Sequence, residues 1–147
     1  MKKIKNIAFI GIGLINSSLA RDLREKNFYQ KSSAYSRTKK TRNILKKLKI
    51  VDKVEDSYAN TVRDADLIVI GVPVEAFSSV IKKISNHLKQ GAIVTDVGSV
   101  KKSLVNVSQK VLSKEVDFIP GHPIAGIEKS GPEYGFKELF QNNFSLI

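Results

Sequence analysis

The chain has 147 residues, of which 41% are hydrophobic and 27% charged, so it has the size and composition of one globular domain. It contains no cysteine, which excludes disulfides, cysteine metal sites and thiol nucleophiles, and no metal site is expected. The net charge is +11, but the basic residues are scattered and not interleaved with aromatic ones, which favours a solvated surface over nucleic-acid binding. No apolar run approaches the roughly 20 residues of a membrane span, and no signal cleavage site follows the N-terminus. We therefore expect a cytoplasmic protein without a membrane partner.

The first 50 residues alternate strand and helix signals. A β-rich apolar run leads into a glycine-containing turn, and apolar residues then recur at the spacing of one helix face. The same order follows once more. The predicted elements are a strand at Lys5–Ile10, a helix with Ile15, Leu19 and Leu23 on one face, a strand at Ser32–Tyr35, and a helix at Thr41–Leu48 with Ile44, Leu45 and Leu48 together.

The alternation continues through the second half of the chain. Its most apolar strand signal has four consecutive aliphatic residues, as expected of a parallel strand covered by helices on both faces. The predicted elements are a strand at Asp66–Pro73, a helix with Phe77, Val80, Ile81, Ile84 and Leu88 that ends at Gly91, a strand at Ala92–Val97, a helix over 99–112 with Leu104, Val107 and Val111 inward, and a strand at 116–120. The last residues, Asn142–Ile147, resemble the start of another strand. This order predicts an α/β fold, a doubly wound (Rossmann-like), mostly parallel sheet with helices on both faces.

The turn after the first strand reads GIGLINSSLA and has the spacing of a dinucleotide-binding turn. Gly11 permits a tight bend and Gly13 lets the backbone approach a pyrophosphate, whereas the third glycine, a packing position, is Asn16 here. The N–H groups at the start of the following helix attract anions, and the hydroxyls of Ser17 and Ser18 are expected to add donors. The alternative is a turn with only a structural role. The place of the glycine turn between a predicted strand and a predicted helix favours dinucleotide binding.

The end of the second strand indicates which dinucleotide is bound. An NAD site usually offers a carboxylate to the ribose about 20 residues beyond the glycine turn. Here the chain instead has Ser36, Arg37, Thr38 and Lys39, which suit a 2′-phosphate. We therefore expect NADP in preference to NAD, the alternative being a solvated basic loop.

Two later segments contain candidates for the chemistry, TDVGSVK and GHPIAGIEKSG. His122 follows a predicted strand directly, so it lies at the ligand-binding edge of the sheet, where a group of near-neutral pKa can accept a proton. His87 is interpreted as a surface residue. Ser99 is either a functional hydroxyl or the cap of a helix beginning at Val100, and Glu128 either a site carboxylate or a solvated one.

Together GIGLINSSLA, DADLIVIGVPV, VTDVGSVK and GHPIAGIEKSG resemble the nucleotide-binding half of the prephenate and arogenate dehydrogenases, enzymes of tyrosine biosynthesis. The resemblance covers essentially the whole chain, and its last two motifs are the specific ones. It implies oxidative decarboxylation: hydride passes from the ring carbon bearing the 4-hydroxyl to a nicotinamide, a histidine accepts the hydroxyl proton, and the ring carboxylate leaves as CO₂.

The resemblance also implies roles for individual residues. His122 corresponds to the proton acceptor, Ser99 to a hydroxyl that supports histidine and substrate, and Glu128 to an acidic group near the entrance of the site. The implied cofactor-binding residues are Gly11, Gly13, Leu14, Ile15 and Asn16 in the turn, Ser36, Arg37 and Thr38 after the second strand, and Val72 and Pro73 at the end of the Asp66–Pro73 strand.

This chain departs from the family pattern in two respects. Asn16 replaces a common glycine, and the family continues into a helical domain that forms a dimer and supplies an arginine for a substrate carboxylate. Residues 1–147 are therefore expected to be a dinucleotide-binding domain ending just before that domain, poorly active alone and a homodimer only with it. Two alternatives stay open: a non-catalytic dinucleotide-binding module or relic, and another small-molecule dehydrogenase of the β-hydroxyacid type. The sequence does not separate prephenate from arogenate.

Overall fold

A computed structural model describes residues 4–143 and 145–146, and its centre is a six-stranded sheet of parallel strands in the order β3-β2-β1-β4-β5-β6. The predicted doubly wound fold is confirmed. The strands are β1 (Asn6–Ile10), β2 (Lys31–Tyr35), β3 (Lys53–Val54), β4 (Leu67–Ile70), β5 (Ile93–Asp96) and β6 (Asp117–Ile119). The helices between them are α1 (Leu14–Glu25), α2 (Lys39–Leu48), α3 (Tyr58–Val62), α4 (Val74–Ser85) and α5 (Lys102–Val111).

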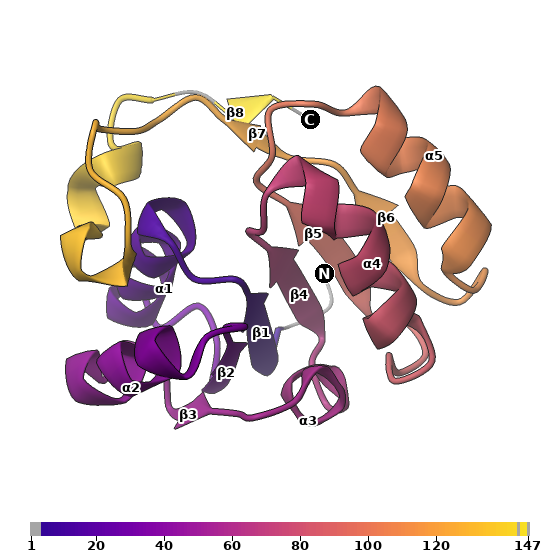
Figure 1. Ribbon diagram of the computed structural model, residues 1–147, viewed down its shortest axis with the longest axis horizontal. Helices are drawn as coiled ribbons and strands as arrows, with labels where there is room; N and C mark the ends of the chain where they lie inside the picture. Colours follow the sequence, from indigo (N-terminus) through magenta and orange to yellow (C-terminus); the bar gives the residue numbers. More distant parts are fainter. Residues whose placement is uncertain (1–3, 144, 147) are drawn as a thin grey trace.

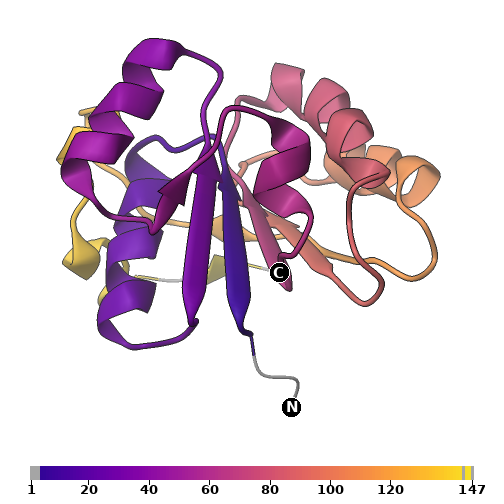
Figure 2. The same ribbon diagram turned by 90° about the horizontal axis from the view of Figure 1, so that it is seen from below.

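Side chains alternate across the sheet and so build two cores. In β1, Ile7 and Phe9 point to one face and Ala8 and Ile10 to the other, because successive strand residues face opposite sides. The first face packs against α1 and α2, and the second against α3, α4 and α5. Figures 1 and 2 show these two helical layers on either side of the sheet. The near-continuous apolar run of β4 follows from burial on both faces.

The helix α4 ends earlier than the sequence predicts. The fourth helix ends at Ser85 with Asn86 as its C-cap, so Leu88 and Gly91 lie beyond it. The polar run Ser85–His87 favours this stop, since serine and asparagine side chains compete for backbone hydrogen bonds, and the Ser85 hydroxyl donates to the carbonyl of Lys82. Gly91 instead forms the turn before β5, at φ +72°.

The fifth helix begins at Lys102 and its capping position is held by Lys101. The interpretation of Ser99 as a helix cap is therefore wrong. The inward face of this helix is as predicted, with Leu104 buried and Val107 and Val111 packed against the core. The exposed position of His87 is also as predicted.

The segment after β6 crosses the carboxyl edge of the sheet and returns over α1. β7 (His122–Pro123) pairs antiparallel with β8 (Ser145–Leu146), at the top of Figure 1. The strand predicted at Asn142–Ile147 is thus found in part, while Phe144 and Ile147 lie outside the described residues. Two 3₁₀ helices, η1 (Pro132–Tyr134) and η2 (Lys137–Phe140), pack against α1. None of the helices in the described part of the chain is both long and apolar enough to cross a bilayer.

Candidate functional site

A cavity of about 330 Å³ opens at the carboxyl end of the sheet, between the loops that follow β1 and β4. The strand order reverses between these two strands, and such switch points form the ligand crevices of doubly wound sheets. We call this the switch-point cavity. Four segments of the chain meet there: the glycine turn, the end of β2, the loop after β4, and the segment before η1. The lining residues are Gly11, Ile12, Gly13, Ser36, Arg37, Thr38, Thr41, Tyr58, Gly71, Val72, Pro73, Ala76, Val80, Gly131 and Pro132.

The two glycines of the turn have different physical requirements. Gly11 has φ +77°, and a Cβ there would lie 2.7 Å from Val72 Cγ1 and 2.8 Å from the Gly71 carbonyl oxygen. At Gly13 a Cβ would meet no atom of the described residues within 4 Å. Gly13 is also the N-cap of α1, where the first N–H groups of a helix lack intrahelical acceptors. The backbone at Gly13 is thus open to a ligand on the cavity side.

Asn16 holds the turn from inside the molecule. Its side chain is buried, with 1% exposed, and Nδ2 donates to the carbonyl oxygens of Gly11 at 2.8 Å and Val69 at 3.3 Å. A Cβ on Gly71 would lie 2.4 Å from this Nδ2, so Gly71 leaves the room that Asn16 fills. The third position of the motif therefore joins the turn after β1 to β4. Leu14, Ile15 and Asn16 form the first turn of α1, and their side chains are not among the cavity lining.

The serines that follow have a structural role. Ser17 and Ser18 are fully buried, and both hydroxyls donate to the Leu14 carbonyl oxygen, at 3.1 and 2.8 Å. The expectation that they donate to a bound anion is wrong, because the segment at Gly135 packs on them. Ser18 Oγ accepts from the N–H of Phe136, and a Cβ on Gly135 would lie 2.0 Å from Ser17 Oγ.

The polar wall of the cavity is the loop at the end of β2. Ser36, Arg37 and Thr38 line it, as the sequence predicts for the adenosine end of a nucleotide. Arg42 shapes this loop, since its Nη1 donates to the carbonyl oxygens of Ser36 at 2.7 Å and Arg37 at 2.9 Å. The Thr38 side chain accepts from the N–H of Thr41 and so caps α2.

Tyr58 reaches the same wall from α3 and was missed by sequence reasoning. Its ring centroid lies 4.4 Å from that of Tyr35. Burial raises the pKa of Tyr58, Tyr35 raises it further, and Arg37 opposes the shift, so the phenol stays neutral near pH 7. The preceding Ser57, which caps α3, was the available signal for this five-residue helix.

His122 lies on the same edge of the sheet, one residue beyond a hydrogen bond between the Gly121 N–H and Asp96 Oδ1. His122 is half-buried, whereas Ser99 and Glu128 are exposed. The structure thus brings the segments of Ser99 and His122 together through Asp96. None of the three predicted residues, Ser99, His122 and Glu128, lines the 330 Å³ cavity. In the described ranges, no group of three His, Cys, Asp or Glu side chains could hold a metal ion.

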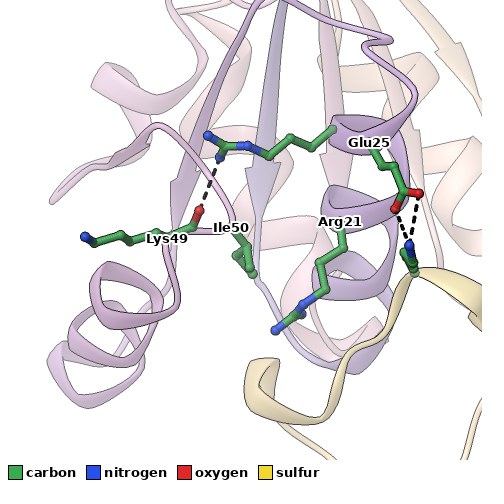
Figure 3. Close-up of a pocket in the computed structure, with 6 residues that line it drawn as sticks. Arg21, Glu25, Lys49 and Ile50 are labelled. Atoms are coloured by element: carbon green, nitrogen blue, oxygen red, sulfur yellow. Dashed lines mark hydrogen bonds and ion pairs between the residues drawn. The ribbon is translucent and has the colours of Figure 1, made fainter.

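A second cavity, of about 350 Å³, lies between α1, the segment that follows α2, and η2 (Figure 3). It is lined by Arg21, Arg24, Glu25, Lys49, Ile50 and Lys137. Three of its four cations, Arg21, Arg24 and Lys137, bind protein groups. Lys137 pairs with Glu25 at 2.7 Å, and Arg24 pairs with Asp52 at 3.3 Å and donates to the Lys49 carbonyl oxygen at 3.2 Å. Arg21 donates to the carbonyl oxygens of Ser17 and Pro132. We call this the basic cavity.

Comparison with known proteins decides the family. The model of the prephenate dehydrogenase nucleotide-binding domain matches residues 19–147. The chain belongs to this family. Its doubly wound fold is therefore that of a nucleotide-binding domain of the prephenate dehydrogenase family.

Individual relatives agree with this assignment. A cyclohexadienyl dehydrogenase from Zymomonas mobilis is 38% identical over 97% of this chain and 48% of the relative. A prephenate dehydrogenase from Lactococcus lactis is 35% identical over 98% of this chain and 41% of the relative. The chain thus spans about half the length of the curated relatives it matches.

Solved structures give the same result. A prephenate dehydrogenase from Aquifex aeolicus, in complex with hydroxyphenyl propionate and NAD⁺, is 33% identical with a TM-score of 0.87, over 96% of this chain and 49% of that one. An arogenate dehydrogenase from Synechocystis is 31% identical with a TM-score of 0.86, over 95% and 48%. The expected family membership and fold are confirmed.

Proposed function

We propose that this chain binds a nicotinamide dinucleotide in the switch-point cavity and serves as the cofactor-binding part of a prephenate or arogenate dehydrogenase. One observation carries the proposal: the cavity is lined by both the glycine turn and the polar end of β2, the two segments that hold the two ends of a dinucleotide's adenosine diphosphate in this fold. The NAD⁺ complex of the Aquifex aeolicus relative supports a nicotinamide cofactor.

The residues present fit such a cofactor. The open backbone at Gly13 and the first-turn N–H groups of Leu14, Ile15 and Asn16 would face the pyrophosphate, favoured by the positive end of the α1 dipole. Gly11 gives the bend that brings them there. Val72 and Pro73 would lie against the cofactor from the β4 side.

We favour NADP over NAD on the chemistry of the β2 loop. Within this loop, Ser36, Arg37 and Thr38 offer hydroxyl and guanidinium groups and no carboxylate. A guanidinium pairs well with a phosphate, and a carboxylate is the usual partner of the free ribose hydroxyl of NAD.

In the proposed reaction His122 accepts the proton of the substrate's 4-hydroxyl while the ring carboxylate leaves as CO₂. When bound, the nicotinamide supplies the hydride acceptor. Ser99 supports His122 and the substrate with its hydroxyl, and Glu128 provides an acidic group near the entrance. Aromatisation of the product makes the step irreversible, so the protein mainly aligns hydroxyl and base, and such alignment supplies roughly 7–11 kcal/mol of a barrier.

We expect a helical domain to supply further substrate contacts and the homodimer interface, and the complete enzyme to work in the cytoplasm. Alone, the chain is expected to bind the nucleotide with little turnover.

The function is tested by joining this chain to the C-terminal half of the Zymomonas mobilis relative and assaying prephenate and arogenate with NADP⁺ and NAD⁺. We expect turnover with at least one pair, and a fall of about 10²- to 10⁴-fold in kcat in His122→Asn without a change in nucleotide affinity. His87→Asn, at an exposed position just beyond the C-terminal end of α4, is the matched control. Full turnover in His122→Asn would contradict the role of His122.

A further inference from the structure

The carboxylate of Asp96, at the end of β5, is 2% exposed, and both its oxygens accept hydrogen bonds. Oδ1 accepts from the N–H of Gly121 at 3.3 Å, and Oδ2 accepts from the N–H of Gly98 at 2.8 Å and from the ammonium of Lys101. Asp96 and Lys101 belong to the TDVGSVK motif, and Gly121 opens the GHPIAGIEKSG motif 25 residues later. One buried carboxylate thus joins the two segments that make the sequence specific to its family.

Lys101 makes the second half of the connection. Its Nζ pairs with Asp96 Oδ2 and also donates to the Gly121 carbonyl oxygen. Gly121 is therefore held at its N–H by the carboxylate and at its C=O by the ammonium. A Cβ on Gly121 would lie 2.8 Å from the Asp96 carbonyl oxygen, so only glycine lets the two strands' ends approach this closely.

These contacts constrain the next residue in the chain. The C=O of Gly121 shares a rigid peptide plane with the N–H of His122, so fixing that carbonyl fixes the backbone on the N-terminal side of His122. On the C-terminal side Pro123 restricts His122 to extended backbone conformations. Antiparallel pairing of His122 with Leu146 in the β7–β8 ladder is consistent with that conformation.

We propose that Asp96 and Lys101 form a clamp on Gly121 that positions His122 for proton transfer. They are positioning residues, since they contact the backbone before His122 rather than the cavity that would hold the nucleotide. The clamp rests on the proposed role of His122 for its function, while its geometry stands on the contacts alone. An ion pair suits the purpose because the carboxylate of Asp96 is buried, so a loop position that takes Lys101 away from it leaves that charge uncompensated and is disfavoured.

The clamp is tested in the 147-residue protein by amide hydrogen exchange and by the ring signals of its two histidines in NMR spectra. In Asp96→Asn an amide NH₂ must face the N–H of Gly121 or the donors at Oδ2, and in Lys101→Met the Gly121 carbonyl loses its donor. We expect exchange at the Gly121 amide to accelerate about ten- to a hundredfold relative to Phe9 in β1, corresponding to one unmade buried hydrogen bond. The His122 ring signals should move toward those of an unfolded peptide, with His87 unchanged.

Matched variants separate the clamp from general effects of charge. Asp117→Asn on β6 and Lys102→Met at the start of α5 make the same chemical changes at exposed positions and should behave like the parent protein. Lys101→Arg keeps a donor and a charge and should restore most of the protection at Gly121.

Two results would overturn the clamp: unchanged exchange at Gly121 and unchanged His122 signals in both variants, or acceleration that is equal at Gly121 and Phe9. Failure of the proposed function is seen separately, as absence of NADP⁺ and NAD⁺ binding by the parent protein.

Discussion

The switch-point cavity and the basic cavity have nearly equal volumes, about 330 and 350 Å³, but differ in the charged side chains that line them. The basic cavity has more charge, with two arginines and two lysines on its wall. Two of these cations are paired with carboxylates, Lys137 with Glu25 and Arg24 with Asp52, and Arg21 donates to two backbone carbonyl oxygens. The switch-point cavity has one arginine and a glycine backbone open to the cavity.

The difference shows that neither volume nor charge identifies a ligand site by itself. A cation already paired with a carboxylate has its field neutralised, and an anion must displace that partner before it can bind. Backbone N–H groups at a helix start have no such competitor within the helix. We therefore expect the groups of the basic cavity to stabilise the fold and those of the switch-point cavity to bind ligand.

Between the two cavities, the largest effect on nucleotide binding is expected at Gly13. In Gly13→Val the side chain enters space that the protein leaves open, so the variant should fold like the parent but bind NADP⁺ about a hundredfold more weakly, or roughly 2.7 kcal/mol. Calorimetric titration measures the affinity and thermal unfolding the stability.

Lys137→Met in the basic cavity is the matched comparison. It removes a cation from the other cavity, together with its pairing to Glu25, and should leave NADP⁺ affinity unchanged. A loss of affinity in Lys137→Met, with Gly13→Val binding normally, would reverse the assignment of the two cavities.

A buried carboxylate at the amino end of the sheet, opposite the switch-point cavity, tests whether a charge that is already paired stabilises the fold. This carboxylate is Asp66, which directly precedes β4. Although burial alone would raise it, hydrogen bonds from Lys89 and from the N–H groups of Asn6 and Lys5 lower the pKa of Asp66 to about 2, from 3.8. Because the folded-state pKa lies below the unfolded one, this carboxylate stabilises the fold above about pH 4. The contribution, at most about 2 kcal/mol, declines as the pH falls and is gone below about pH 2.

Urea unfolding of the parent and Asp66→Asn between pH 7 and pH 2 measures this contribution. The gap in unfolding free energy should be largest at neutral pH and close in acid, whereas Asp64→Asn, at an exposed position, should show a small gap throughout. A gap for Asp66→Asn that does not change with pH would contradict the linkage.

A smaller effect is expected from the coupling between Asn16 and Gly71. Asn16→Ala leaves two carbonyl oxygens without their donor, at about 1–3 kcal/mol, and Gly71→Ala places a Cβ against the Asn16 amide. The double variant should be more stable than the sum of the single changes predicts, by about 1 kcal/mol. The rescue is partial because that Cβ also lies 2.9 Å from the Gly11 carbonyl oxygen. Strict additivity in urea unfolding would show that Asn16 does not occupy the space Gly71 leaves.

The fold class and most elements could be predicted because long periodic segments report burial directly. Leu45 on α2 and Ile81 on α4 are fully buried as their spacing requires. The two-residue β3 and five-residue α3 are too short for periodicity to show, so Tyr58 was missed as a cavity residue. The end of α4 was placed too late because the apolar Leu88 continues the stripe after the helix has stopped.

Residues that line the cavity could be predicted where a single sequence motif contains them. Contacts between two distant segments of the chain could not be predicted. Gly11, Ser36 and Val72 line the cavity as the motifs suggest. The interior contacts of Asn16 and the burial of Ser17 and Ser18 depend on residues 53 to 118 positions away, at Val69 and Phe136. The clamp of Asp96 on Gly121 is of the same kind, since nothing in either motif alone shows its partner.

The most direct measurement is the mapping of amide chemical-shift changes while NADP⁺ is titrated into the 147-residue protein. We expect saturable shifts at Gly11, Gly13, Arg37 and Val72, tighter binding of NADP⁺ than of NAD⁺, and weakened shifts in Gly13→Val. Saturable shifts confined to Arg24, Lys49 and Lys137, or none at all, would contradict the switch-point cavity as the nucleotide site.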